Sequence, residues 1–379
     1  MNSLREIVES SPSIRHLAFG SERAEPEPLA PARWEWNQIR RILVVRLRSV
    51  GDTVLATPSL FSLRRFLPFA QIDILLEDWV APVLEGSDLI NRVMTVPRSG
   101  QSARARVARE LRAARYDVVY NLHGGTTATF LTRATGAKYR VGFEHYQYAR
   151  LHNHAAPSAA KLWGRSQLHS VEQQLALLGW TGVPVTDRPP TQLTITAKAD
   201  QAVTDRLRAA NVDGPFVLIH PSAAFDTKRW AAEKFALVTE ELAARGFKSV
   251  ITVKDDEAQI LESIAAQSTA PLTAMKALSL PEVAALATRS KLFLGNDSGI
   301  AHIAAAVGTP SVVIFGSSNR AHWRPWTTKP NEIVFEEMPC QPCPGYSCAE
   351  FEKPECILRV PVERVVAAID RVLQQIDLS

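Results

Sequence analysis

Features that mark a membrane-spanning or exported protein are absent from this sequence of 379 residues. It has no run approaching the roughly 18 apolar residues that a membrane-spanning helix needs. The first 30 residues lack the apolar core of a signal peptide, so we expect a cytoplasmic protein. With 46% hydrophobic and 22% charged residues, the composition is that of a globular chain, and its length favours two domains.

The common nucleotide-binding signatures are also missing. A predicted strand over residues 41–47 is followed by the turn Arg48–Asp52, RSVGD, which has one glycine where a dinucleotide fingerprint needs three. The turn is not a P-loop either. It offers one carboxylate, Asp52, at the start of a helix predicted over residues 52–67. Asp52 either caps that helix or serves, ionised and positioned, as a general base, and the residues alone leave both interpretations open.

No known nucleic-acid motif interleaves the aromatic and basic residues, so we expect no nucleic-acid partner. The charge is nevertheless uneven. Residues 1–190 hold 24 lysines and arginines against 17 acidic residues, whereas residues 191–379 hold 19 against 22. One predicted helix is either a solvated face or a contact for an anionic partner, such as a phosphorylated glycan or a membrane surface. It carries Arg104, Arg106, Arg109, Arg112 and Arg115.

Cysteine is scarce and confined to one segment with the spacing C-x2-C-x4-C-x7-C. Disulfides are not expected in a cytoplasmic chain. The cluster therefore predicts either a structural zinc or iron site or reduced structural thiols, and neither makes the cysteines catalytic. Its members are Cys340, Cys343, Cys348 and Cys356.

Short apolar strands alternate with helical segments, which predicts an α/β protein with parallel sheets covered on both faces. Residues 136–170 show little periodicity, and Thr181–Pro190 carries three prolines and suits a linker. We predict an N-terminal extension over residues 1–38, with Trp34 and Trp36 packing onto the first domain. Two doubly wound domains follow, over residues 39–185 and 186–379, and they face each other across a cleft.

The segment Leu294–Phe315 reads LGNDSGIAHIAAAVGTPSVVIF, a predicted strand, polar turn, small-residue helix and second strand. A glycine-containing turn that opens a helix directs unpaired N–H groups and the positive end of the helix dipole at one point, which suits a phosphate. The alternative is an ordinary capped helix, because Asn, Asp and Ser are common N-caps.

Other polar residues follow strands in the second half. Lys228 and Arg229 either neutralise a diphosphate or form an exposed pair. Among the acidic residues after strand 249–253, one either accepts ribose hydroxyls or caps a helix. His302 lies one turn into the small-residue helix, a position more typical of a structural histidine.

Three ordered blocks resemble glycosyltransferase family 9, the ADP-heptose:lipopolysaccharide heptosyltransferases. The family's opening is similar to RILVVRLRSVGDTVLATPSLFSLRRFLP, and its second and third blocks to TKRWAAEKFALV and FLGNDSGIAHIAAAVGTPSVVIFG. A cysteine cluster beside HWRPW also recurs in many members. The resemblance covers residues 40–370. It implies the GT-B fold, in which the first Rossmann-like domain binds the acceptor and the second binds the nucleotide-sugar donor.

The resemblance also implies roles for individual residues. Asp52 matches the family's proposed catalytic base, and Lys228 matches the lysine on the donor phosphates. A ribose-binding acid belongs near Asp256 or Glu257, although Val253–Asp256 stands where members usually have a glycine-rich turn. The turn whose amides bind the diphosphate matches Asp297, Ser298, Gly299 and Ile300.

The implied reaction moves a heptose from ADP-heptose to the inner core of lipopolysaccharide by a single inverting displacement. Lys228 and the turn amides stabilise the leaving diphosphate. Catalysis then needs no cofactor, in agreement with the lack of a D-x-D pair in the expected place. The implied partners are the donor, an anionic lipid-linked glycan and the inner face of the inner membrane. The alternatives are another glycan or protein acceptor, or a nucleotide-binding protein without activity.

Overall fold

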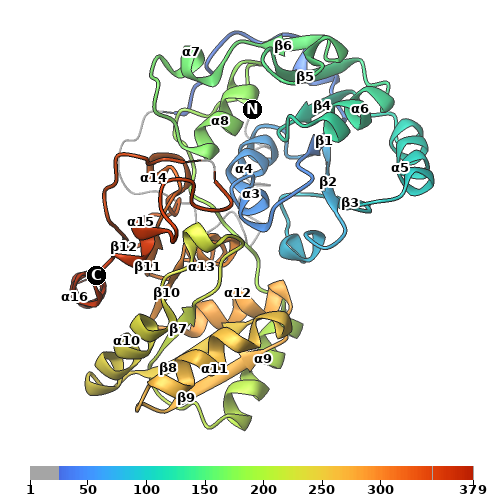
Figure 1. The fold of residues 1–379 in the computed structure, drawn as a ribbon. Coiled ribbons are helices and arrows are strands. Elements are labelled where there is room, and N and C mark those ends of the chain that lie inside the picture. Colours follow the sequence, from blue (N-terminus) through green and yellow to red (C-terminus); the bar gives the residue numbers. More distant parts are fainter. Residues whose placement is uncertain (1–24, 344, 379) are drawn as a thin grey trace.

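Two six-stranded parallel sheets form the framework of the computed structural model, which describes residues 25–343 and 345–378 (Figure 1). The strand order is β3-β2-β1-β4-β5-β6 in the first sheet and β12-β11-β10-β7-β8-β9 in the second. Each order reverses at one point, between β1 and β4 and between β7 and β10. Doubly wound sheets bind ligands at such switch points, in the crevice outside the carboxyl ends of the strands.

The first sheet lies between α4 and α8 on one face and α5 and α6 on the other. Its strands are β1 Arg41–Val45, β2 Gln71–Glu77, β3 Arg92–Val96, β4 Val118–Asn121, β5 Tyr139–Phe143 and β6 His154–Ala156. The helices around it are η1 Trp36–Gln38, α3 Val50–Val54, α4 Thr57–Phe66, η2 Ala81–Leu84, α5 Gln101–Ala113, α6 Thr126–Ala134, η3 Ala149–Leu151, α7 Ala159–Trp163 and α8 Ser170–Gly179.

The second sheet lies between α10, α11 and α16 on one face and α9, α12 and α13 on the other. Its strands are β7 Phe216–His220, β8 Lys248–Val253, β9 Leu272–Lys276, β10 Leu292–Asn296, β11 Ser311–Phe315 and β12 Asn331–Phe335. Its helices are α9 Ala197–Ala209, η4 Asp226–Lys228, α10 Ala232–Ala244, η5 Asp255–Glu257, α11 Ala258–Gln267, α12 Leu280–Arg289, α13 Gly299–Ala306, α14 Arg320–Trp323, α15 Glu355–Leu358 and α16 Val362–Asp377.

Strand β1 illustrates why the apolar runs fold as buried strands. Ile42 and Val44 face the core under α4 and α8, and Leu43 and Val45 face the core under α5 and α6. None of the four is exposed to solvent. A strand buried on both faces reads as a continuous apolar run, and burying each such side chain contributes about 1.5–3 kcal/mol.

The predicted N-terminal extension is described only from residue 25 onward, and residues 1–24 lie outside the described part of the chain. The backbone N–H groups of Leu29 and Ala30 donate to the Gly179 carbonyl at 3.0 and 3.1 Å. The Trp34 ring stacks on Tyr139 with 4.5 Å between centroids. The end of the extension therefore packs on the first domain, as the sequence predicted.

The helix predicted over residues 52–67 is divided in two. Helix α3 begins earlier, at Val50, and helix α4 begins at Thr57 with Pro58 in its first turn. A proline has no N–H and fits only the first turn of a helix without disruption. The division therefore has a cause that is visible in the sequence.

Residues 136–170, which show little periodicity, form β5, η3, β6 and α7. Strands β5, β6, β9 and β12 were not predicted. The last three lie at an edge of a sheet, and β5 lies beside β6. An edge strand is partly exposed and lacks the continuous apolar run that marks a central strand. Within the described residues, no helix is long and apolar enough to cross a membrane.

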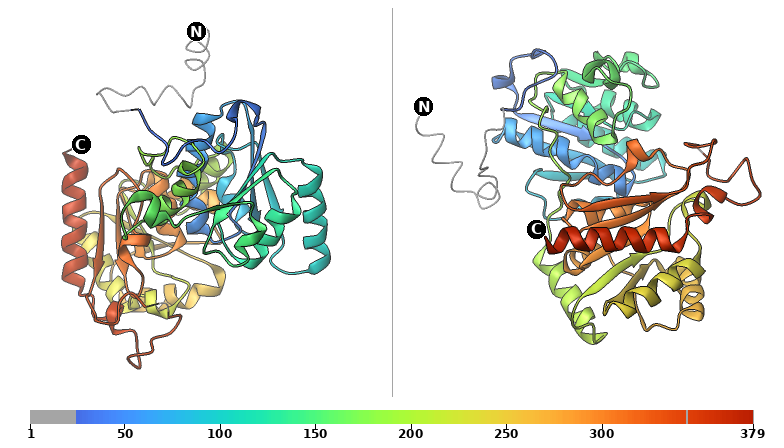
Figure 2. Two further views of the ribbon diagram at one scale, coloured as in Figure 1. Left: turned by 90° about the horizontal axis from the view of Figure 1, so that it is seen from above. Right: turned by 90° about the vertical axis from the view of Figure 1, so that its left-hand side faces the viewer.

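The two halves of the molecule meet where α3 packs against α13 (Figures 1 and 2). Ile303 and Ala306 of α13, together with Val283 and Ala284 of α12, belong to the hydrophobic core of the first sheet. The apolar contact therefore continues from one half into the other beside both switch points.

Candidate active site

Asp52 lies in the first turn of α3, directly beyond the carboxyl end of β1. Its carboxylate accepts hydrogen bonds from the backbone N–H and hydroxyl of Ser49, both at 3.1 Å, and pairs with the Arg46 guanidinium. Burial works to raise the pKa of Asp52, but the charge of Arg46 and the Ser49 hydrogen bonds outweigh it and hold the pKa below its ordinary value. Asp52 is thus both a helix cap and an ionised, oriented carboxylate.

Arg46 links Asp52 to the neighbouring strand β4. Its guanidinium also donates to the carbonyl of Leu122 at 2.5 Å. The next residue, His123, has a pKa lowered to about 4, mainly by burial and then by the charge of Arg46. The imidazole is therefore neutral at pH 7, and its buried Nδ1 has no hydrogen-bond partner in the described structure.

Lys228 occupies the matching position beyond the second sheet. Its Nζ lies 2.8 Å from the carboxylate of Asp297, which is only 5% exposed and also accepts from the Ser318 hydroxyl at 2.5 Å. Asn296, the last residue of β10, donates to the Pro221 carbonyl at 2.7 Å and accepts from the Trp230 N–H at 3.2 Å. These bonds tie the loop that carries Lys228 to the end of β10.

The turn at residues 297–300 opens helix α13 as the sequence predicted. Ser298 is the N-cap, but its side chain makes no capping hydrogen bond, and its buried Oγ has no partner among the described residues. The first N–H groups of a helix have no acceptor within the helix. They and the helix dipole are directed at the space beside Lys228, which suits an anion.

The two acidic candidates after β8 differ in their surroundings. Glu257 accepts a hydrogen bond from the Ser222 hydroxyl, beyond the end of β7, and another from the Lys254 N–H at 3.2 Å. Burial opposes ionisation of Glu257, yet the bonds from Ser222 and Lys254 keep its pKa below the ordinary value. Asp256 is exposed. Glu257 is therefore the acid held at the switch point.

Helices α3 and α13 approach closely enough to join the two sets of residues. A Cβ added to Gly51 would lie 2.7 Å from the His302 ring, and one added to Gly299 would lie 3.2 Å from the Gly51 nitrogen. His302 is buried, and both Asp297 and Asp52 act on its pKa, which burial nevertheless lowers overall. The carboxylate of the first half and the Lys228–Asp297 pair of the second thus share one neighbourhood.

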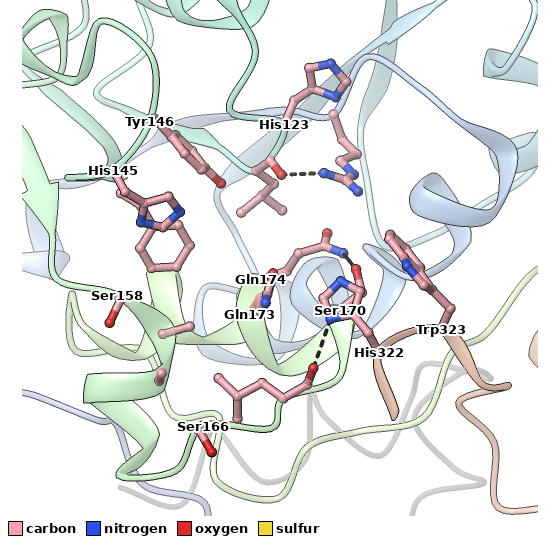
Figure 3. A pocket seen from close by; sticks show the side chains of 16 residues that line it. His123, His145, Tyr146, Ser158, Ser166, Ser170, Gln173, Gln174, His322 and Trp323 are labelled. Atoms are coloured by element: carbon pink, nitrogen blue, oxygen red, sulfur yellow. Dashed lines mark hydrogen bonds between the residues drawn. The ribbon is translucent and has the colours of Figure 1, made fainter. Parts of the chain in front are cut away.

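A pocket of about 340 Å³ opens beside Arg46 in the first half (Figure 3). Tyr146 and Gln174 reach toward its middle, and His123 lies nearby. Gln174 has a buried oxygen without a partner in the described structure. His322 and Trp323 of α14 complete the wall from the second half, with His322 Nδ1 donating to the Leu168 carbonyl at 2.9 Å. The pocket suits a polar ligand that carries hydroxyl groups.

Comparison with known proteins decides the family. A family model described as glycosyltransferase family 9 (heptosyltransferase) matches residues 104–353. The chain is 31% identical over 351 residues to lipopolysaccharide heptosyltransferase 3 of Escherichia coli, with 86% of this chain and 97% of that protein covered. The chain belongs to glycosyltransferase family 9.

Solved structures agree in fold with this family 9 glycosyltransferase. ADP-heptose lps heptosyltransferase II of E. coli matches with a TM-score of 0.75 at 21% identity, over 89% of this chain and 99% of that chain. E. coli heptosyltransferase WaaC, solved with ADP-2-deoxy-2-fluoro heptose, matches with a TM-score of 0.65 at 19% identity, over 87% and 99%. The architecture is the GT-B fold, as predicted.

The four cysteines of this glycosyltransferase lie near one another but do not form a recognisable metal centre in the described structure. All four are free thiols, and Cys356 is the buried one. Burial and then the nearby thiols raise the pKa of Cys356. The described residues contain no group of three or more His, Cys, Asp or Glu that could hold a metal ion. TibC of enterotoxigenic E. coli H10407, an iron-containing dodecameric glycosyltransferase, matches with a TM-score of 0.55 at 16% identity, over 89% of this chain and 77% of that chain.

Several residues at the site were not predicted from the sequence. Arg46 was assigned only to the predicted strand 41–47, and His123 was not singled out. Both follow neighbouring parallel strands, whose carboxyl ends meet at one edge of a sheet, so their meeting follows from the strand order. Arg229, predicted beside Lys228, instead pairs with Asp226 at 3.0 Å on the exposed side of the loop.

Proposed function

We propose that this glycosyltransferase moves a heptose from ADP-heptose to the inner core of lipopolysaccharide. One observation carries the proposal: Asp52 and the Lys228–Asp297 pair come from the switch points of different sheets and share the junction of α3 and α13. A base on one side and anion-stabilising groups on the other suit a single displacement between an acceptor hydroxyl and a nucleotide sugar. The similarity to lipopolysaccharide heptosyltransferase 3 supports heptose as the transferred sugar and lipopolysaccharide as the class of acceptor.

In this mechanism Asp52 takes the proton of the acceptor hydroxyl as its oxygen attacks the anomeric carbon. The new glycosidic bond forms on the face opposite the bond to ADP, which breaks, so the configuration inverts. Asp52 is ionised at neutral pH because Arg46 and Ser49 hold its pKa low. A low pKa makes a weaker base, but orientation and ionisation are what general base catalysis requires first.

The leaving diphosphate gains negative charge as the bond breaks. Lys228 and the backbone amides of Asp297, Ser298, Gly299 and Ile300 are the groups that we expect to stabilise it. Asp297 orients the Lys228 ammonium through its carboxylate. Preorganised donors aimed at developing charge contribute on the order of 3 kcal/mol each. Catalysis by these groups requires no cofactor.

Glu257 is the acid that we expect to accept the ribose hydroxyls of the donor. Glu257→Gln should raise the KM for ADP-heptose about tenfold, because a hydrogen bond to a charged acceptor is weakened, and should leave kcat and the acceptor KM nearly unchanged. The exposed neighbour supplies a matched control, Asp256→Asn, which should behave as wild type. Steady-state kinetics of both variants measures this. Equal increases in KM would show that neither carboxylate is the specific contact.

We assign acceptor binding to the domain at residues 39–185 and donor binding to that at 186–379. The pocket beside Arg46 lies mainly in the first of these, and Arg46, which lines it, pairs with Asp52. The acceptor is then an anionic lipid-linked glycan, and the enzyme works as a peripheral protein at the inner face of the inner membrane. The basic first half supports this location. We propose no nucleic-acid partner, because no known nucleic-acid motif interleaves the aromatic and basic residues.

A structural zinc or iron at Cys340, Cys343, Cys348 and Cys356 remains part of the proposal. Its support is the spacing of the thiols and their nearness to one another, although the side chains as arranged do not form a closed site. Elemental analysis of the purified protein tests it, and less than stoichiometric metal would exclude it. No step of the transfer depends on this site.

The function is tested by incubating the enzyme with ADP-heptose and a bacterial lipid extract and analysing the products by mass spectrometry. We expect a core glycolipid that is heavier by one heptose residue. Transfer only to a different glycan or to a protein would support a family 9 enzyme with another acceptor. Binding of ADP without turnover on any acceptor would favour a nucleotide-binding protein without activity.

A further inference from the structure

Most of the excess positive charge of the first half comes from one stretch. Residues 98–150 contain ten lysines and arginines against three acidic residues. Within the described part of the chain, none of these thirteen charged residues takes part in an ion pair, whereas arginines elsewhere commonly do, such as Arg371 with Glu332 at 2.6 Å. Unpaired cations gathered in one region create a positive potential that attracts an anionic partner.

Most of these cations lie on or next to helices α5 and α6. Helices α5 and α6 cover the same face of the first sheet and pack on each other. The Arg112 guanidinium lies against Gly136, just after α6, since a Cβ there would overlap it. The solvent side of α6 presents Thr126, Phe130 and Arg133 in one stripe. In Figure 2 (left view), α5 lies on the opposite side of the molecule from α16.

Two exposed aromatic rings lie among the cations. Phe130 of α6 is 52% exposed and Tyr148, just before η3, is 42% exposed. Their ring centroids are 5.4 Å apart. Tyr148 has a φ of 58°, a left-handed conformation that an aromatic residue adopts only where the surroundings hold it. An apolar pair inside a basic face suits the interfacial region of a membrane, where tyrosine rings are enriched.

The same chain segment forms a wall of the pocket beside Arg46. His145 and Tyr146 line the pocket, while Tyr148, two residues further, packs on Phe130. Gln147 between them accepts a hydrogen bond from the Thr126 hydroxyl at the start of α6, at 2.6 Å. A partner that binds the exposed side of α6 would therefore lie next to the pocket.

We propose that the α5–α6 face, formed by Arg106, Arg109, Phe130, Arg133, Tyr148 and Arg150, docks on a bilayer leaflet rich in anionic lipid. Its arginines contact the headgroups and its two rings enter the interfacial region. The proposal rests on the proposed function in one respect, that the acceptor is held in a membrane. The exposed aromatic pair among unpaired arginines favours a bilayer, because tyrosine rings are enriched in the interfacial region of a membrane.

The test is co-sedimentation of the full-length protein with vesicles that contain neither donor nor glycan. Vesicles of phosphatidylethanolamine with phosphatidylglycerol should bind the protein, vesicles of phosphatidylcholine should not, and added salt should weaken the binding. The triple variant R106Q/R109Q/R133Q should bind about tenfold more weakly or worse, since each arginine at an anionic surface adds to affinity. The variant F130S/Y148S should also bind several-fold more weakly.

Matched controls remove the same groups elsewhere. R208Q/R359Q/R371Q removes three exposed arginines from the second half, and F69S removes a ring that is 78% exposed in the turn between α4 and β2. Both should bind as wild type. Thermal unfolding of every variant identifies any that are destabilised, and transfer to a delipidated, water-soluble acceptor should be unaffected in all of them.

The outcomes separate this proposal from the proposed function. No binding of the wild type, equal binding to phosphatidylcholine, equal losses in the two arginine variants, or wild-type binding by F130S/Y148S would each overturn the docking surface and leave the transferase proposal standing. Vesicle binding that follows the α5–α6 face, together with no transfer to any acceptor, would support the docking surface and overturn the function.

Discussion

Asp52→Asn should lower kcat for transfer from ADP-heptose by about a thousandfold, a typical contribution of a general base. The amide can still accept hydrogen bonds from Ser49, so α3 should keep its cap, but it cannot take the acceptor proton. The protein should fold and should bind ADP as wild type does, because Asp52 belongs to the half to which we assign acceptor binding. Circular dichroism and titration calorimetry check these two points, and a radiolabelled donor assay measures kcat.

A second carboxylate at the same edge of the first sheet provides the control. Asp78 is exposed and follows β2, and its carboxylate accepts a hydrogen bond from the neighbouring Trp79 N–H at 2.9 Å. Asp78→Asn should retain wild-type turnover. If Asp52→Asn kept more than about a tenth of the activity, the loss would be too small for a general base, and Asp52 would be a helix cap alone.

Lys228→Met should lower kcat by about a hundredfold or more, since one preorganised donor to the leaving group is lost. Affinity for ADP should fall as well, because in the proposed mechanism the ammonium contacts the diphosphate before and after transfer. Methionine keeps most of the apolar stem of lysine. The change also removes the cation beside Asp297, which is only 5% exposed, and should reduce the free energy of unfolding by about 2 kcal/mol.

A double variant separates these two effects. In K228M/D297N the remaining partner is neutral, so no unpaired charge is buried, and stability should return close to that of the wild type. Activity should remain low, since the ammonium is still absent. Recovery of transfer in the double variant would mean that Lys228 serves only to neutralise Asp297. Thermal unfolding and turnover measured on the same preparations distinguish the two cases.

Most of the central strands could be predicted because they are buried on both faces, as the unbroken apolar run Ile42–Val45 illustrates. Strand β5, whose first two residues are partly exposed, was missed. Of the edge strands only β3 was predicted. Strand β6 has three residues, and β9 and β12 are partly exposed, so they carry a weaker pattern. The division of the first long helix was predictable from Pro58, whose missing N–H suits only a first turn.

Site residues could be predicted where a reactive side chain directly follows a predicted strand. They could not be predicted where their position depends on tertiary packing. Three features follow strands and match family motifs: Asp52, Lys228 and the 297–300 turn. Their placement near the switch points could therefore be predicted from the sequence. That Glu257 and not Asp256 reaches Ser222 could not be predicted, because adjacent positions in the sequence do not show which side chain turns toward β7. The pairing of Arg46 with Asp52 depends on how the turn between β1 and α3 folds back, which no local pattern reveals.

The pH dependence of kcat/KM for the wild type and for Arg46→Gln tests the central claim most directly, because it follows the ionisation of the base itself. Arg46 lowers the pKa of Asp52, and only the ionised carboxylate can accept the proton. Wild-type kcat/KM should therefore fall only at pH values below the ordinary range of an aspartate. Removal of the guanidinium raises the pKa, so the acid limb should move upward by about one unit or more. An acid limb at the same pH in both proteins would contradict the account, since the titrating group would then not be Asp52.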